Sequence, residues 1–263
     1  MKFAVRNGCF SYRDNQTVLK NISFEADKGQ ILSVLGCNGA GKTTLLKCML
    51  GFLKWQKGDT FVDDRPLSSI SSSFLWQRVS YVPQAHFQSF PCTVEETVLM
   101  GRNPYLNMFR SPGKLDEKKA EEAMKLCGIY DLRKESINEI SGGQMQLAYI
   151  ARALCTEPEV IVLDEAETGL DYANQLTVLR LMKKLSIEKG ITVIFNTHYP
   201  DHALDISEKT LLFMKDGTYL TGSTKEILNE TNLEKAFGTR IRMLECEIEG
   251  RTYHSLVPYE KGK

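Results

Sequence analysis

Short apolar runs, separated by turn residues, divide the first part of the chain into strands. Alternating or β-branched residues at 3–10 and 18–27, joined by the polar turn 13–16, predict antiparallel strands. The apolar run at 31–35 predicts a buried strand, and the apolar residues at 45–50 have helical spacing. Further segments are predicted as strands at 58–63 and 78–82 and as a loop with helical tendency at 68–73.

Helical signals replace strand signals in the middle of the chain. Thr93 and Glu96 have the capping-box spacing that begins a helix. Amphipathic or apolar patterns predict two more helices at 116–127 and 144–154. Residues 103–113 contain two prolines among polar and aromatic residues and predict a loop.

An α/β pattern resumes after this helical stretch. Residues 160–163 are apolar on both faces, as in a central parallel strand. The segments that follow are predicted as a helix (172–189), a strand (191–196), a hairpin with an Asp-Gly turn (210–220), two short helices (223–229 and 231–237) and a tail whose stretches 243–248 and 252–257 can pair as strands.

These segments predict one domain over residues 1–263. We expect an α/β core formed by 1–84 and 158–225, an inserted helical subdomain at 85–157 and a C-terminal appendage at 226–263. The sequence contains no internal repeat, low-complexity segment or interdomain linker.

Composition excludes several classes of protein. Apolar residues make up 42% and charged residues 25% of the chain, as in an ordinary globular protein. Basic and acidic residues balance at 33 each, so no global field attracts nucleic acid, and we expect no nucleic-acid partner. No apolar stretch has the length of a spanning helix, and the N-terminus does not have the pattern of a signal peptide. The seven cysteines lack zinc spacing and predict reduced, mostly buried thiols of a cytosolic protein.

The glycine-rich run between the strand at 31–35 and the helix at 45–50 carries the clearest chemistry. It fits the pattern G-x-x-x-x-G-K-[ST] in the strand–loop–helix context of a phosphate-binding loop. Backbone N–H groups and the helix N-terminus favour an anion there, while a glycine-rich turn with a solvent lysine is the alternative. The predicted nucleotide-binding residues are Gly36, Cys37, Asn38, Gly39, Ala40, Gly41, Lys42, Thr43 and Thr44.

Two carboxylates follow the apolar strand at 160–163. Ligands bind at the carboxyl ends of parallel strands, so Asp164 and Glu165 are expected in the site rather than as simple strand-end residues. Asp164 and the Thr43 hydroxyl are predicted to hold Mg²⁺, and Glu165 is predicted to orient the attacking water or accept its proton.

The run Ile140-Ser141-Gly142-Gly143-Gln144 resembles the signature motif of ATP-binding cassette (ABC) ATPases. It lies between the phosphate loop and the Asp-Glu pair, as in that family, although alone it would also fit a serine-capped helix start. The resemblance covers about residues 3–228 and implies a RecA-like P-loop NTPase core with an antiparallel β subdomain and a helical subdomain.

The resemblance also implies a role for individual residues. Ser141, Gly142, Gly143 and Gln144 are expected to bind the γ-phosphate of the opposite subunit, so function implies a head-to-tail dimer with a second copy of the chain and ATP shared at the interface. The other matched positions are Tyr12 for adenine stacking, Gln84 as the Q-loop glutamine at Mg²⁺ or water, Asp171 in the D-loop and His198 as the switch histidine, with Lys42 and Glu165 completing the catalytic set.

Some positions depart from the family pattern. Ala166 and Glu167 stand where Pro-Thr is usual, Ile140 replaces a common leucine, and Met145 occupies a position that is often basic. None of these changes removes a catalytic group. A charge at Glu167, close to the D-loop, is nevertheless unusual for the family.

Residues 82–102 are similar to the ATPases of iron–siderophore, haem, cobalamin and molybdate importers. His86, Phe87 and Phe90 would receive an amphipathic helix of a permease, unless they make an ordinary buried loop contact. The resemblance therefore implies a peripheral ATPase at the cytoplasmic face of the membrane, with permease subunits as direct partners and an external binding protein as an indirect one. A regulatory or non-transport ABC ATPase is the alternative, and the sequence does not name the cargo.

Overall fold

Two β-sheets and a group of helices make up the structure. The computed structural model describes residues 1–13, 17–84, 92–106 and 111–260. Within these residues, six strands form a main sheet in the order β10-β9-β3-β8-β7-β6. Its strands are β3 (Ile31–Leu35), β6 (Val79–Val82), β7 (Val160–Asp164), β8 (Thr192–Asn196), β9 (Lys209–Phe213) and β10 (Tyr219–Ser223).

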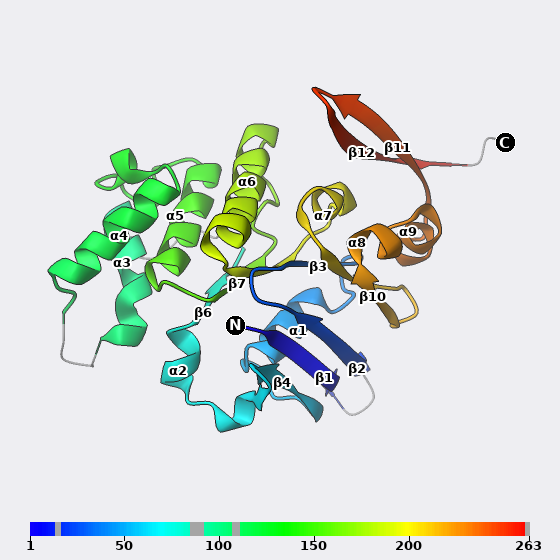
Figure 1. The fold of residues 1–263 in the computed structure, drawn as a ribbon, viewed down its shortest axis with the longest axis horizontal. Coiled ribbons are helices and arrows are strands. Elements are labelled where there is room, and N and C mark those ends of the chain that lie inside the picture. The colour runs from blue at the N-terminus through cyan, green and yellow to red at the C-terminus, as the bar shows by residue number, and fades with distance from the viewer. Residues whose placement is uncertain (14–16, 85–91, 107–110, 261–263) are drawn as a thin grey trace.

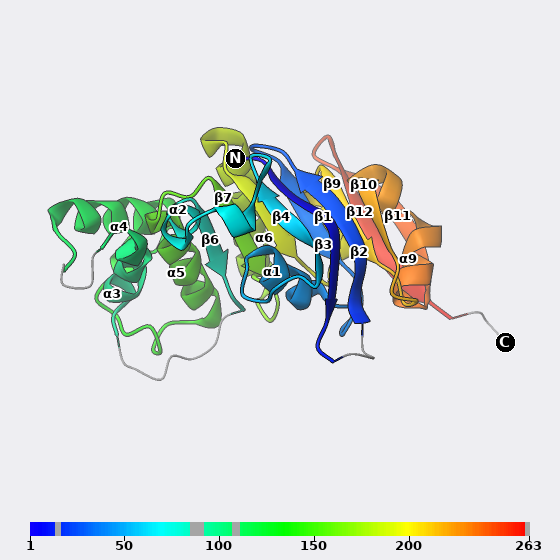
Figure 2. The ribbon, with the colours of Figure 1, turned by 90° about the horizontal axis from the view of Figure 1, so that it is seen from below.

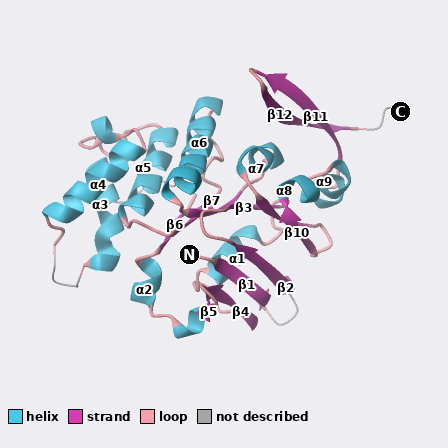
Figure 3. Cartoon of the chain, in the orientation of Figure 1, coloured by secondary structure: helices cyan, strands magenta, loops and turns pink. Residues whose placement is uncertain are grey.

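The centre of the main sheet is parallel and completely buried. Every residue of β3, β7 and β8 is buried, because helices cover one face of the sheet and α1 (Lys42–Met49), together with the N-terminal antiparallel strands, covers the other (Figure 3). β3 pairs in parallel with β8 and β9, and β7 pairs in parallel with β6 and β8. The carboxyl ends of these strands therefore meet at one edge, where α/β sheets bind ligands.

A second, antiparallel sheet forms the N-terminal part, as predicted. Its order is β2-β1-β4-β5, and the predicted pair at 3–10 and 18–27 corresponds to β1 (Phe3–Ser11) and β2 (Thr17–Ala26). β4 (Lys57–Val62) and β5 (Arg65–Pro66) complete it. The helix α1 (Lys42–Met49) shares one core with both sheets, in which Phe3, Leu46 and Val162 are fully buried (Figure 2).

The middle of the chain is helical and lies at one end of the molecule (Figure 1, green). Its helices are α3 (Val94–Leu99), α4 (Lys114–Leu126) and α5 (Gly142–Cys155), with the 3-10 turns η2 (Met100–Tyr105) and η3 (Tyr130–Leu132). Thr93 and Glu96 form the predicted capping box. The predicted loop at 103–113 is wrong at its start, because η2 continues through Tyr105. Arg102, on η2, holds it with a buried bond to Asp116 (2.9 Å).

Helices and a hairpin complete the chain after the central strands. The predicted helix at 172–189 is α6 (Tyr172–Lys189), which ends at Gly190 in the left-handed conformation. The helix α7 (Pro200–Ile206) was not predicted from the sequence. The remaining elements are η1 (Leu67–Ser69), α2 (Ser72–Trp76), α8 (Thr224–Ile227), α9 (Glu230–Phe237), β11 (Arg240–Ile248) and β12 (Arg251–Tyr259).

The tail pairs as the alternation of its side chains predicted. β11 and β12 form a separate antiparallel hairpin, which lies far from the helical region (Figure 1, red). Ile241 is buried in a small core with Ala203 of α7 and Leu233 of α9. The hairpin is therefore attached to the helix that follows β8.

Two expectations about the whole chain have structural outcomes. The cysteines are not mostly buried: Cys48, Cys127 and Cys155 are buried, whereas the other four are partly or fully exposed. Burial raises the pKa of the three buried thiols to about 12. Over the ranges that the structure describes, no helix combines the length and apolarity needed to cross a membrane.

Candidate active site

The phosphate loop joins β3 to α1 at the carboxyl edge of the main sheet. Gly41 lies at the N-cap of α1 with φ of 100°, a left-handed conformation that favours glycine. A Cβ atom there would lie 3.0 Å from Cγ1 of Val18, so the close approach of β2 also requires glycine. The loop therefore presents its backbone N–H groups at the start of a helix, as an anion site requires.

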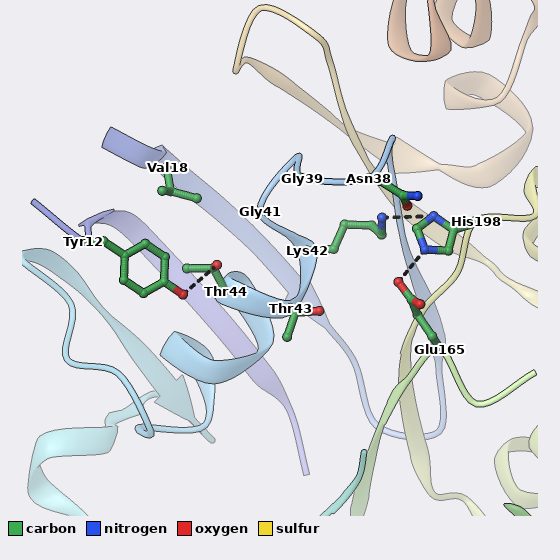
Figure 4. Close-up of a pocket in the computed structure, with 10 residues that line it drawn as sticks. All are labelled: Tyr12, Val18, Asn38, Gly39, Gly41, Lys42, Thr43, Thr44, Glu165 and His198. Carbon is green, nitrogen blue, oxygen red and sulfur yellow. Dashed lines mark hydrogen bonds and ion pairs between the residues drawn. The ribbon is translucent and has the colours of Figure 1, made fainter. Parts of the chain in front are cut away.

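A pocket of about 390 Å³ opens over this loop (Figure 4). It collects residues from the antiparallel sheet and its edge, from the phosphate loop and α1, and from the segments that follow β7 and β8. The lining residues are Tyr12, Val18, Asn38, Gly39, Gly41, Lys42, Thr43, Thr44, Glu165 and His198. Nine of these ten, all except Val18, were predicted site residues.

Lys42 crosses the base of the pocket. It is 4% exposed, and its Nζ donates to the carbonyl oxygens of Gly36 (2.9 Å) and Cys37 (3.2 Å). Nζ also lies 3.2 Å from Nδ1 of His198. Burial lowers the pKa of Lys42, against the opposing field of Glu165. An anion in the pocket would favour the charged form of this amine.

Glu165 and His198 face each other across the pocket. Nε2 of His198 lies 2.5 Å from Oε1 of Glu165, so Lys42, His198 and Glu165 form one continuous chain of contacts (Figure 4). Glu165 has φ of 53°, which is uncommon for a residue with a side chain. Such backbone strain occurs at functional sites where the surroundings hold it in place.

The bond that holds this strained backbone comes from Asn196, at the end of β8. Its Oδ1 accepts from the N–H of Glu165 (2.6 Å), and its Nδ2 donates to Oδ1 of Asp164 (2.5 Å). Asp164 and Asn196 are direct partners in the parallel pairing of β7 and β8. Through these two bonds, a single fully buried amide holds both acidic residues.

Two of the three residues predicted to hold Mg²⁺, Thr43 and Asp164, lie together at the carboxyl end of β7. Oγ1 of Thr43 lies 3.2 Å from Oδ1 of Asp164, and the hydroxyl of Tyr81 donates to Oδ2 of Asp164 (2.9 Å). Burial, followed by the field of Asp164, raises the pKa of Tyr81 above its usual value, so Tyr81 remains a donor. A hydroxyl and a carboxylate oxygen are suitable ligands for Mg²⁺, which keeps several waters in proteins. These residues fit such an ion.

Tyr12 and Cys37 lie on opposite sides of the phosphate loop. Tyr12 is 56% exposed, and its hydroxyl lies 3.1 Å from Oγ1 of Thr44. Its ring contacts Phe10 edge-on, with 4.9 Å between centroids. Cys37 is partly exposed, and its Sγ donates to the carbonyl oxygen of Ala236 in α9 (3.1 Å). The C-terminal appendage therefore touches the loop directly.

The remaining predicted residues lie outside this pocket. Ser141 and Gln144 form a capping box at the start of α5, and Ser141 and Gly142 are exposed. Asp171 is the N-cap of α6 and accepts from the N–H of Asn174 (2.8 Å). Gln84 is exposed, two residues beyond the end of β6. His86, Phe87 and Phe90 lie outside the described residues.

Comparison with known proteins identifies the family. A family model described as ABC transporter matches residues 19–168, more than half of the chain. The chain belongs to the ABC transporter family. The predicted family resemblance is thereby confirmed, and with it the P-loop NTPase fold.

Individual relatives cover almost the whole ABC protein. It is 34% identical over 258 residues to the molybdate import ATP-binding protein MolC of Haemophilus influenzae, covering 98% of this chain and 96% of that one. A solved transporter described as metal-chelate type, in an inward-facing conformation, is 34% identical over 98% of both chains, with a TM-score of 0.89. A dimeric ATP-binding cassette bound to ADP and Pi is 26% identical, covers 84% of this chain and 98% of that one, and has a TM-score of 0.70. The ABC protein is an ATPase coupled to transport and binds ATP.

Three residues in and around the ABC pocket were missed by sequence reasoning. Asn196 and Tyr81 both lie on strands beside Asp164, where the parallel register brings strand ends together. For Asn196, the sequence did contain a signal: an asparagine at the end of the strand that follows the acidic pair. Val18 lines the pocket from β2, and its position depends on the packing of the two sheets.

Proposed function

We propose that this chain is the ATP-hydrolysing subunit of a membrane importer and works as a head-to-tail dimer. The observation that carries the proposal is the chain of contacts Lys42–His198–Glu165 in one pocket with Thr43 and Asp164. The core formed by residues 1–84 and 158–225 binds the nucleotide. The helical subdomain at 85–157 carries the signature motif, and the appendage at 226–263 lies against the phosphate loop.

Lys42 and the loop N–H groups of residues 36–44 bind the phosphates of ATP. In the structure Lys42 donates to the loop's own carbonyl groups, which a triphosphate would replace as a stronger, charged partner. Tyr12, exposed at the other side of the pocket, stacks on the base. Asn38, exposed in the loop, lines the pocket near His198.

Glu165 orients the attacking water, and His198 contacts the γ-phosphate. The 2.5 Å contact between them places a proton acceptor beside a group that can stabilise charge on the transferred phosphoryl group. Mg²⁺ would be held by Thr43 and Asp164, with Gln84, two residues beyond β6, as a further ligand, and would neutralise phosphate charge. Asn196 and Tyr81 keep Asp164 fixed in position.

The second chain completes each site. Ser141, Gly142, Gly143 and Gln144 lie outside their own pocket, and their position at a helix N-terminus suits them to bind an anion from another copy. Asp171 caps the neighbouring helix α6, whose first turn lies close to the start of α5. A Cβ atom at Gly143 would lie only 2.4 Å from Cγ of Asn174. The dimeric relative with ADP and Pi supports this arrangement.

The relatives support import of an oxyanion or a metal chelate. One acts in molybdate import, and another is described as a metal-chelate type transporter. The chain would then lie at the cytoplasmic face of the membrane, held by permease subunits, with an external binding protein delivering the cargo. Uptake of labelled molybdate and of iron–siderophore complexes by a deletion strain distinguishes these cargo classes, and unimpaired uptake of both excludes them.

The Glu165→Gln variant tests the catalytic proposal. It preserves the size of the side chain and one acceptor oxygen but removes the charge and the proton acceptor, so ATP affinity should stay within about twofold while turnover falls at least 100-fold, as for loss of a general base. Binding is measured with a fluorescent ATP analogue and turnover by phosphate release. Undiminished turnover in this variant would remove the role of Glu165. A wild-type protein that binds ATP without any hydrolysis would favour the regulatory alternative.

A further inference from the structure

A buried carboxylate and a partly buried histidine close to the site take no part in the mechanism described above. Glu167 follows Glu165 by two residues and is 0% exposed. Within the described part of the chain, neither of its carboxylate oxygens has a hydrogen-bond partner. Nδ1 of His202 lies 3.8 Å from Oε1 of Glu167 and is also buried without such a partner.

The hydrogen-bonding capacity of this buried pair is not satisfied. A buried carboxylate without hydrogen bonds is destabilising, because it has lost its hydration without gaining a partner. The distance of 3.8 Å is within reach of an ion pair but longer than a hydrogen bond, which needs about 2.7–3.2 Å. An approach of roughly 1 Å would form a charge-assisted hydrogen bond and remove the cost for both groups. A shorter distance between Nδ1 of His202 and Oε1 of Glu167 is therefore favourable.

Closing this gap would link the two catalytic segments at a second point, beside the existing 2.5 Å contact between His198 and Glu165. The N–H of Thr168 donates to the carbonyl oxygen of Glu165 (3.1 Å), so Glu167 lies inside the turn that begins at the catalytic carboxylate. Nε2 of Gln175, on α6, donates to the carbonyl oxygen of Glu167 (3.3 Å) and fixes the other side of this turn. The acidic side chain is thus carried by a turn that is hydrogen-bonded both to Glu165 and to α6.

His202 is attached to the other catalytic segment. It lies in the first turn of α7, and its ring lies 4.7 Å from the ring of Tyr199, the residue directly after His198. α7 packs against α6 and the hairpin strand β12. A shift of His202 toward Glu167 therefore carries the loop that holds His198.

We propose that Glu167 and His202 form an internal latch, in which a hydrogen bond between them fixes His198 against Glu165 for hydrolysis. The latch rests on the proposed roles of Glu165 and His198, and its two members are positioning residues that do not touch the nucleotide. A carboxylate at position 167 departs from the threonine usual in the family, so the latch belongs to this chain's own sequence.

Substitutions at Glu167 and His202 distinguish a latch that acts on turnover from a purely structural role of the pair. Glu167→Met and His202→Leu each remove one partner, and we expect kcat to fall about tenfold with the ATP affinity within twofold. Glu167→Gln retains an acceptor and should keep kcat within about threefold. Each single variant leaves the other polar group unpaired, which should lower the unfolding temperature. The double variant Glu167→Met/His202→Leu removes both polar groups, so its unfolding temperature should return toward the wild-type value while kcat stays at the value of the single variants.

The matched control is the pair His254–Glu245 on the hairpin, where Nε2 and Oε1 are 3.4 Å apart and the glutamate is exposed. Glu245→Met should leave kcat unchanged. Wild-type kcat in both single variants, independent multiplicative losses in the double variant, or a parallel fall in ATP affinity would each overturn the latch. If Glu165→Gln abolishes turnover while Glu167→Met and His202→Leu do not, the latch alone is wrong. Normal turnover in Glu165→Gln refutes the proposed function instead.

Discussion

Asn196 offers a sharp test, because a single amide holds both acidic residues of the site. In Asn196→Ala, the part-buried N–H of Glu165 loses its acceptor (2.6 Å) and the buried Asp164 loses a donor (2.5 Å). Each buried group left unsatisfied costs about 1–3 kcal/mol, so the free energy of unfolding should fall by about 2–4 kcal/mol. For a chain of this size the unfolding temperature should fall by roughly 10 °C.

The same substitution should impair turnover more than nucleotide binding. Loss of a group that orients a metal ligand typically costs about 10–100-fold in activity or metal affinity. We therefore expect phosphate release to fall within that range and the Mg²⁺ concentration for half-maximal activity to rise. Asn196→Asp separates the two bonds, because it keeps an acceptor for Glu165 while it places a like charge beside Asp164.

The assay pairs thermal unfolding with phosphate release over an Mg²⁺ titration. Asn103→Ala, at an exposed position in the helical region, is the matched control and should change neither quantity. Wild-type turnover and stability in Asn196→Ala would refute the idea that this amide holds the site. A stability loss without any change in turnover would show that Asn196 supports the fold only.

Three further predictions concern nucleotide binding. Lys42→Ala removes the buried amine, so MgATP should no longer raise the unfolding temperature, and a retained shift would contradict its role. Alkylation of Cys37 should block ATP binding sterically and ATP should protect it, whereas Cys48, whose pKa burial raises to about 12, should not react at neutral pH. Unchanged ATP affinity after confirmed labelling of Cys37, with exposed Cys246 replaced by serine, removes this prediction. Tyr12→Ala should weaken ATP binding about fivefold, and an unchanged Kd excludes stacking.

Most of the helices and strands could be predicted from local sequence patterns. The capping box at Thr93, the glycine after α6 and the apolar residues 160–163 each specify their own element. Two of the helical elements that were missed, α7 and η2, are short and contain prolines, so their signals resemble those of loops. They form because tertiary contacts hold them, as the buried Arg102–Asp116 bond does for η2.

The site was predictable where chemistry depends on neighbours in sequence. Gly41, Lys42 and Thr43 are specified by one continuous motif. Asn196 and His202 depend on contacts across 31 and 35 positions in sequence, which only the packing of strands and helices reveals. The cysteines illustrate the same limit, because residue type alone did not predict their exposure.

The central claim is that two chains share each ATP. Light scattering of the Glu165→Gln variant with saturating MgATP tests it most directly, because hydrolysis can no longer separate the subunits. The account predicts a particle of twice the 29.8 kDa of one chain, and predicts that adding Ser141→Arg to this variant returns it to a single chain while ATP stays bound. A particle of one chain mass with ATP bound, or a dimer that Ser141→Arg leaves intact, would contradict it.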